Sequence, residues 1–156
     1  MSLCSEWIEL LQTLNTEKAR YLVIGGHAYA LHVEPRYTGD LDLWVEPTEA
    51  NAKLVWSALT QFGAPLGDTS LNDFTRSSLV FQMGIVPNRV DILCGIEGVT
   101  FGEAWKSKQK ALLGDVPVFI ISRDLLIRNK LAAGRAKDLL DVKMLRKSKP
   151  TRRRKR

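Results

Sequence analysis

The chain has 156 residues, of which 45% are hydrophobic, and this predicts one globular domain with a core of its own. No apolar run reaches the length of a membrane span, and Glu6 and Glu9 interrupt the N-terminal segment where a signal peptide would be apolar. Without an export signal, Cys4 and Cys94 are expected to be reduced thiols in a cytoplasmic protein that makes no membrane contact.

The net charge of +6 originates at the C-terminal end. Of the 23 Lys and Arg residues, eight lie in 146–156, where there is no acidic residue. The rest of the chain has 15 basic and 17 acidic residues and therefore carries a net charge of −2. We expect a folded domain over residues 1–147 and a basic, disordered tail over 148–156, because like charges repel and nothing apolar offsets the entropy lost on ordering. The tail is either simply solvated or contacts the phosphates of RNA or DNA.

Hydrophobic periodicity predicts helices and strands distributed along the whole folded part. Helical spacing, with Thr48 and Ser122 as N-caps, predicts helices over 4–18, 27–33, 49–62, 101–112, 123–133 and 135–147. Alternation or short β-branched runs predict five strands, over 21–25, 40–46, 79–85, 89–95 and 116–121. Glycine, proline and aspartate predict a loop over 63–75.

Two glycines, Gly25 and Gly26, stand where the first predicted strand turns into a helix. Without Cβ atoms the backbone can approach a ligand closely, and the free N–H groups at a helix start favour an anion such as phosphate. The alternative is that the glycines only satisfy the backbone geometry of the turn.

Three aspartates in two predicted strands are candidate metal ligands. Alternation puts Asp40 and Asp42 on one strand face, with Cα atoms roughly 6.6 Å apart, so both can reach one divalent cation or a pair about 3.5–4 Å apart. A magnesium-bound nucleotide beside a phosphate-binding turn needs a third acid, and Asp91, in the middle of a later strand, is the candidate. The alternatives are a solvated face for Asp40 and Asp42, and a buried ion pair of Asp91 with Arg36 or Arg89.

Gly25-Gly26, Asp40-Leu41-Asp42 and the single strand residue Asp91 together resemble the nucleotidyltransferase superfamily related to DNA polymerase beta. The similarity is greatest to its small bacterial and archaeal members, which are minimal nucleotidyltransferases and transferase components of abortive-infection and toxin–antitoxin systems. It covers about residues 20–46, 79–95 and 123–143. It implies that residues 1–147 form an α+β nucleotidyltransferase domain, with a mixed, mostly antiparallel sheet of about five strands flanked by helices.

The resemblance also implies roles for the matching residues. Three would be catalytic and would bind magnesium, as two ions, with manganese as an alternative: Asp40, Asp42 and Asp91. Five would belong to the NTP-binding site, namely Gly25, Gly26, Arg36, Thr38 and Lys130. The glycines would touch the triphosphate through their backbone, Lys130 would neutralise phosphate charge, and Arg36 and Thr38 would either contact phosphate or brace the loop. On the alternative interpretation, Lys130 and Lys137 are exposed helix residues, and Arg135 forms surface ion pairs of little energetic value with Asp138 or Asp141.

Gly26 departs from the family pattern, because many members have Gly-Ser at this position and the serine hydroxyl contacts phosphate. His27, which follows, is either a substitute hydrogen-bond donor or a packed histidine.

The implied activity is transfer of a nucleoside monophosphate from an NTP to a hydroxyl of an RNA end, a protein or a small molecule, in a toxin–antitoxin or phage-defence setting. The basic tail favours an RNA or protein acceptor, and the short chain favours a homodimer or a partner protein that binds the acceptor. The alternative is a nucleotide-binding regulatory or antitoxin partner with little or no catalysis. A metal nuclease or glycosyltransferase fits less well, because the two glycines favour a triphosphate.

Overall fold

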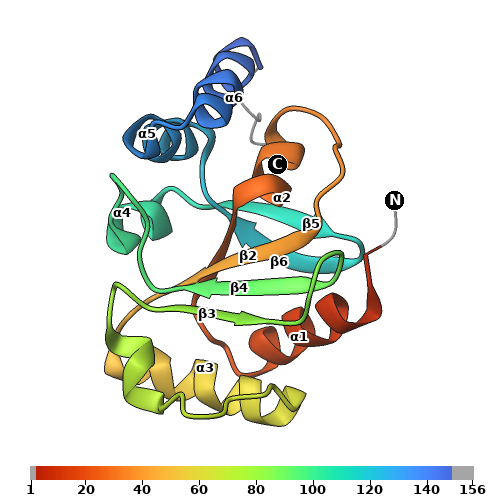
Figure 1. The fold of residues 1–156 in the computed structure, drawn as a ribbon, viewed down its shortest axis with the longest axis vertical. Helices are drawn as coiled ribbons and strands as arrows, with labels where there is room; N and C mark the ends of the chain where they lie inside the picture. Colours follow the sequence, from red (N-terminus) through yellow and green to blue (C-terminus); the bar gives the residue numbers. More distant parts are fainter. Residues whose placement is uncertain (1–2, 149–156) are drawn as a thin grey trace, which may run out of the picture.

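The structure is a computed structural model that describes residues 3–148, so residues 149–156 of the predicted tail lie outside the described residues. Its helices are α1 (Ser5–Thr16), α2 (Gly25–His32), α3 (Glu49–Phe62), η1 (Leu71–Thr75, a 3₁₀ helix), α4 (Phe101–Lys106), α5 (Arg123–Ala133) and α6 (Ala136–Lys147) (Figure 1). Its strands are β1 (Tyr21–Ile24), β2 (Asp40–Val45), β3 (Val80–Met83), β4 (Arg89–Leu93), β5 (Gln109–Leu113) and β6 (Val116–Ile120). Between residues 3 and 148, no helix combines the length and apolar character needed to cross a membrane.

The six strands form one sheet in the order β3-β4-β2-β1-β6-β5. Three neighbouring pairs are antiparallel, namely β1–β2, β3–β4 and β5–β6, and two are parallel, namely β2–β4 and β1–β6. The predicted mixed, mostly antiparallel sheet flanked by helices is therefore confirmed. Strand β2, which carries Asp40 and Asp42, is hydrogen-bonded on both sides, so its backbone is fixed at the centre of the sheet.

Apolar cores cover both faces of the sheet. The β2 residues Leu41, Leu43 and Val45 belong to the core that contains residues of α1 and α3. Trp44, which points the other way, packs with residues of α2, α4, α5 and α6. Figure 1 shows the same division, with α1 and α3 on one side of the sheet and the other four α-helices on the opposite side. Asp40 and Asp42 therefore share the face that α2, α5 and α6 approach.

The main difference from the sequence prediction lies at residues 101–112. One helix is predicted there, but α4 ends at Lys106 and the following residues form β5, antiparallel to β6. The two-residue turn Gly114-Asp115 connects these strands, and Gly114 has a φ of 58°, a conformation that tight hairpin turns need and glycine adopts without steric cost. The sheet therefore has six strands instead of about five.

Both predicted N-caps are present. The hydroxyl oxygen of Thr48 accepts a hydrogen bond from the backbone N–H of Asn51 at the start of α3. The hydroxyl of Ser122 accepts one from the backbone N–H of Leu125 and so begins α5. These two caps fix where the helices leave β2 and β6.

Candidate active site

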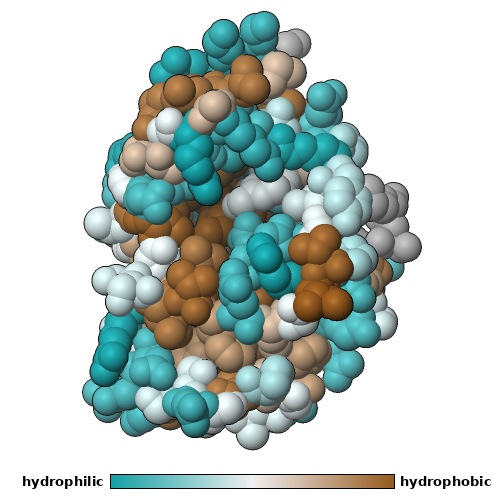
Figure 2. Space-filling model, in the orientation of Figure 1, coloured by the Kyte–Doolittle hydropathy of each residue, from teal (hydrophilic) through white to brown (hydrophobic). Residues whose placement is uncertain are grey.

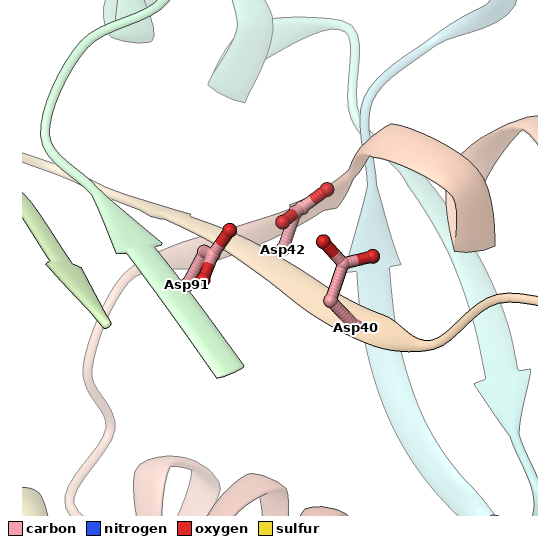
Figure 3. A group of neighbouring side chains, drawn as sticks. All are labelled: Asp40, Asp42 and Asp91. Carbon is pink, nitrogen blue, oxygen red and sulfur yellow. The ribbon is translucent and has the colours of Figure 1, made fainter. Parts of the chain in front are cut away.

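The register of β2 against β4 brings the three aspartates together. The strands are parallel, with Asp42 opposite Asp91 and Asp40 opposite Arg89. Figure 3 shows Asp40 and Asp42 on one strand and Asp91 on its neighbour, with their carboxylates turned toward the same space. One carboxylate oxygen of each lies within 4.8 Å of the others. Such an all-oxygen donor set suits Mg²⁺ or Mn²⁺.

The electrostatics of this cluster also fit a cation. Burial raises the pKa of Asp42 to about 7, and the negative charges of Asp40 and Asp91 add to the effect. Burial likewise raises the pKa of Asp91, although the nearby guanidinium of Arg89 opposes the shift. A divalent cation among the three carboxylates would favour their ionised forms. Binding of the cation would relieve the mutual repulsion of the carboxylates, and this relief would contribute to the binding energy.

Arg89 bridges two of the three acids. Its Nη2 donates to Oδ2 of Asp40 at 2.9 Å, and its Nε lies 3.1 Å from Oδ1 of Asp91. Of the two ion-pair partners considered for Asp91 from the sequence, the structure therefore shows Arg89 and not Arg36. The sequence pattern assigns Arg89 no site role of its own, although its position two residues before Asp91 places both on one strand face.

The two glycines allow close approach at the start of α2. Gly25 has a φ of 65°, and a Cβ atom there would collide with Oδ2 of Asp42. A Cβ atom at Gly26 would collide with the γ-methyl of Thr38. No side-chain oxygen caps this helix at Ile24. The glycines thus let the carboxylate and the loop close against a helix start whose N–H groups need partners.

Basic side chains from three segments are held by two buried aspartates of α6. Arg36 donates to both carboxylate oxygens of Asp141, at 2.9 and 3.2 Å, and Lys130 Nζ donates to the same carboxylate at 2.9 Å. Arg135 donates to Asp138 at 2.7 Å, and Lys130 lies 3.6 Å from Asp138. Burial disfavours ionisation of both aspartates, but hydrogen bonds and charge from these cations outweigh it and hold the pKa of each below its usual value.

This network decides between alternatives left open by the sequence. Lys130 is only 8% exposed and is not a solvated helix residue, whereas Lys137 is exposed. Of the two partners considered for Arg135, the structure shows Asp138, and this ion pair is exposed only on the arginine side because Asp138 is 5% exposed. The burial of Asp138 and Asp141 is not predictable from the sequence, since their spacing from basic residues is that of ordinary surface pairs on a helix.

Contacts within the protein account for three further residues near the start of α2, namely His27, Arg36 and Thr38. Arg36 lies over the ring of Tyr29, 3.8 Å from its centroid, and Thr38 Oγ1 donates to the Arg36 carbonyl at 3.2 Å. Both residues therefore brace the loop before β2. His27 packs edge-on against Trp7, with ring centroids 5.1 Å apart, which is the packed-histidine alternative.

A cleft of about 660 Å³ unites these groups. Its lining includes all eight predicted site residues, namely Gly25, Gly26, Arg36, Thr38, Asp40, Asp42, Asp91 and Lys130. Arg89, Arg135 and Lys137 line it as well. Figure 2 shows the molecule hollowed between the α5–α6 end and the sheet, with hydrophilic side chains on both sides of the hollow. The cleft therefore has an acidic wall on β2 and β4 and a basic wall supplied by α5 and the Arg36 loop.

Comparison with solved structures identifies the fold. A candidate nucleotidyltransferase from Thermotoga maritima superposes with a TM-score of 0.59, at 17% identity over 88% of each chain. The lincosamide antibiotic adenylyltransferase LnuA, bound to lincomycin, superposes with a TM-score of 0.57, at 14% identity over 94% of this chain and 98% of that chain. No protein-family model and no curated protein matches the sequence. The chain has the nucleotidyltransferase fold, as the resemblance in its motifs predicts.

Proposed function

We propose that the protein is a magnesium-dependent nucleotidyltransferase, which moves a nucleoside monophosphate from an NTP to an acceptor hydroxyl. The observation that carries this proposal is the convergence of Asp40, Asp42 and Asp91 in a cleft whose opposite wall is basic. A magnesium–triphosphate complex presents both charge types, a cation for the acids and phosphate oxygens for the basic wall. The shared fold of the two solved structures agrees with this assignment.

Each part of the cleft has a binding task in this proposal. Asp40, Asp42 and Asp91 would hold two magnesium ions, and manganese meets the same ligand requirement. The backbone N–H groups at Gly25 and Gly26 would receive phosphate oxygens, because a helix start favours anions. Lys130 and Arg36, fixed by Asp141, would provide positive charge to the triphosphate from the opposite wall.

The proposed reaction is an in-line displacement at the α-phosphorus. The acceptor oxygen forms a bond to the α-phosphorus, the bond from that phosphorus to the bridging oxygen breaks, and pyrophosphate leaves. Bound magnesium would supply Lewis-acid stabilisation of the attacking and leaving oxygens. Asp91 would take the hydroxyl proton, directly or through an ordered water, and the basic wall would stabilise the negative charge of the pyrophosphate.

The acceptor is proposed to be a hydroxyl of an RNA end, a protein or a small molecule. LnuA, which has this fold, is bound to an antibiotic, so a small-molecule acceptor belongs in any screen. The basic C-terminal sequence supports an RNA or protein acceptor because it attracts polyanions. A role in a toxin–antitoxin or phage-defence system stays a prediction from the sequence resemblance.

The test is transfer of label from each α-labelled NTP, with magnesium, to a panel of total tRNA, cell protein, aminoglycosides and lincomycin. Wild type is expected to label one acceptor class, and Asp42→Asn is expected to lose the activity. The matched control is Asp68→Asn, since Asp68 is an exposed acid that does not line the cleft. Undiminished labelling by Asp42→Asn would contradict the metal assignment. Tight magnesium–NTP binding without transfer to any acceptor would favour a regulatory nucleotide-binding protein.

A further inference from the structure

We propose that Arg89 is a built-in counter-ion of the acidic site, which holds Asp40 and Asp91 in the metal-free protein and must be displaced when a divalent ion binds. This inference rests on the proposed function, because it describes how the same site takes up metal and nucleotide. Its consequence is that metal alone binds weakly and that the nucleotide, by offering anionic partners to the released guanidinium, makes metal binding tighter.

The position of Arg89 follows from strand register. It stands directly opposite Asp40 across the parallel β2–β4 pair, and it precedes Asp91 by two residues on β4. Its guanidinium therefore projects from the same face as all three carboxylates. Arg89 Nη2 lies 2.9 Å from Oδ2 of Asp40 and 3.4 Å from Oδ2 of Asp91. These carboxylates belong to the donor set that would bind a metal ion, so arginine and metal compete for them.

Arg89 satisfies fewer of the hydrogen-bonding atoms in its ion pairs than Arg36 of the basic wall does. Arg36 makes two hydrogen bonds to Asp141, at 2.9 and 3.2 Å. By contrast, Arg89 Nε and Asp91 Oδ1 lie 3.1 Å apart, yet within residues 3–148 neither atom has a hydrogen-bond partner. The two arginine side chains are similarly exposed, at 33% and 30%, but the carboxylates that Arg89 holds are more accessible, because the Asp40 and Asp91 side chains are 27% and 12% exposed against 6% for Asp141. A pair with unsatisfied atoms and access to water can be exchanged at smaller cost than a buried bidentate pair.

The Arg89–carboxylate contacts and metal binding are linked equilibria because both involve a positive charge at the same carboxylates. A guanidinium and a divalent cation held by the same carboxylates repel each other, so binding of one weakens binding of the other. Arg89 lines the cleft that also contains Gly25, Gly26 and the basic wall. Once displaced, its guanidinium is placed to contact phosphate oxygens bound there. Metal and nucleotide would then strengthen each other by the same factor, because linkage is reciprocal.

The experiment measures Mn²⁺ binding by electron paramagnetic resonance, without turnover, in wild type and Arg89→Met. Each protein is titrated with Mn²⁺ alone and then with Mn²⁺ plus α,β-methylene analogues of ATP and GTP. Arg89→Met is expected to bind Mn²⁺ alone about tenfold more tightly than wild type, and the added gain from the analogue is expected to shrink by about the same factor. Arg20→Met is the matched control, because Arg20 pairs with Glu46 and does not line this cleft.

Thermal denaturation provides a second readout. Without metal, Arg89→Met is expected to melt below wild type, and Mn²⁺ is expected to raise its melting temperature more than that of wild type. Arg89→Lys retains the charge, so its Mn²⁺ affinity and melting temperature are expected to stay close to those of wild type. If Arg89→Met does not fold, Arg89→Gln replaces it as the neutral variant and Arg89→Lys is the folded comparison. Equal or weaker binding of Mn²⁺ alone by the neutral variant would overturn the inference while leaving the proposed function intact. Absence of Mn²⁺–nucleotide binding in wild type would overturn the proposed function.

Discussion

Asp42 and Asp91 occupy the same register position on two parallel strands, and this pairing sets the geometry of the acidic wall. A shift of β4 by one residue would turn Asp91 to the opposite face, into the core that contains Val90 and Ile92. The apolar alternation of β4 therefore positions a candidate catalytic group, because burying Val90 and Ile92 leaves Asp91 only one face to occupy.

Replacing Asp42 by Asn is expected to stabilise the metal-free protein at neutral pH. The carboxyl has an ordinary pKa of 3.8, whereas folding raises the pKa to about 7. Between these values the native state retains a proton that the unfolded state has released, so this carboxyl makes the protein less stable as the pH rises from about 4 to 7. Since a pKa difference of one corresponds to about 1.4 kcal/mol, the rise from 3.8 to about 7 sets an upper limit of roughly 4 kcal/mol on the gain of Asp42→Asn at pH 8, and almost none of this gain is expected at pH 4.

Urea denaturation of wild type and Asp42→Asn at pH 4, 6 and 8 measures this difference. The informative quantity is the change of the difference with pH, because any packing effect of the amide is present at every pH. If the difference in unfolding free energy between the two proteins did not change with pH, folding would not raise the pKa of Asp42.

Replacing Gly25 by Ala is expected to damage the site beyond the cost of backbone strain. Its φ of 65° alone costs an L-residue about 1–2 kcal/mol, and the new Cβ would also displace the carboxylate of Asp42. Gly67→Ala is the matched control, because Gly67 has a φ of 52° with no atom near the added Cβ. Transfer activity is expected to fall roughly a hundredfold for Gly25→Ala and to be unchanged for Gly67→Ala, as label transfer per folded protein would show. Similar behaviour of the two variants would argue against the close approach of Asp42.

The nucleotidyltransferases that these motifs resemble often have a serine where this chain has Gly26, and we expect a serine there to be harmful in this chain. Its Cβ would meet the γ-methyl of Thr38, which is held in place by the hydrogen bond from Thr38 to the Arg36 carbonyl. Gly26→Ser is expected to cost about 1–3 kcal/mol, as overpacking does. Thr38→Ser removes only that methyl, so the double variant is expected to recover most of the loss, and a double-mutant cycle of denaturation free energies measures the coupling. Additive effects would contradict the contact.

Lys130→Met is expected to destabilise the fold, whereas Lys137→Met is expected to have little effect. Lys130 neutralises the buried carboxylates of Asp138 and Asp141, which retain Arg135 and Arg36 as partners. The expected cost is about 2–3 kcal/mol, below the roughly 3–5 kcal/mol for a buried charge left without any partner. Lys137 is exposed, so its replacement should change stability by less than about 0.5 kcal/mol. Equal melting temperatures for the two variants would exclude the buried role of Lys130.

The sequence is most informative where chemistry and periodicity coincide. Alternation places Asp40 and Asp42 on one strand face, and the need for a third metal ligand points to Asp91 in the middle of a later strand, so the acidic wall is predictable from the residues themselves. The hairpin strand β5 is not predictable from periodicity, because its apolar spacing continues that of α4 and only Gly114-Asp115 signals the turn. The partners of Lys130 depend on how α6 packs, which is a tertiary property. The same holds for Arg89, whose importance depends on the register of β4 against β2.

The basic wall has one further consequence for substrate recognition. Arg36 and Lys130 already donate to the carboxylate of Asp141, so a triphosphate bound as proposed would have to take over part of that hydrogen bonding. Affinity at this wall is therefore a difference between two sets of charge-assisted contacts, and it is smaller than the number of positive side chains suggests. This competition would make binding selective for strongly anionic ligands, because a weakly charged ligand could not replace the carboxylate of Asp141 as a hydrogen-bond acceptor.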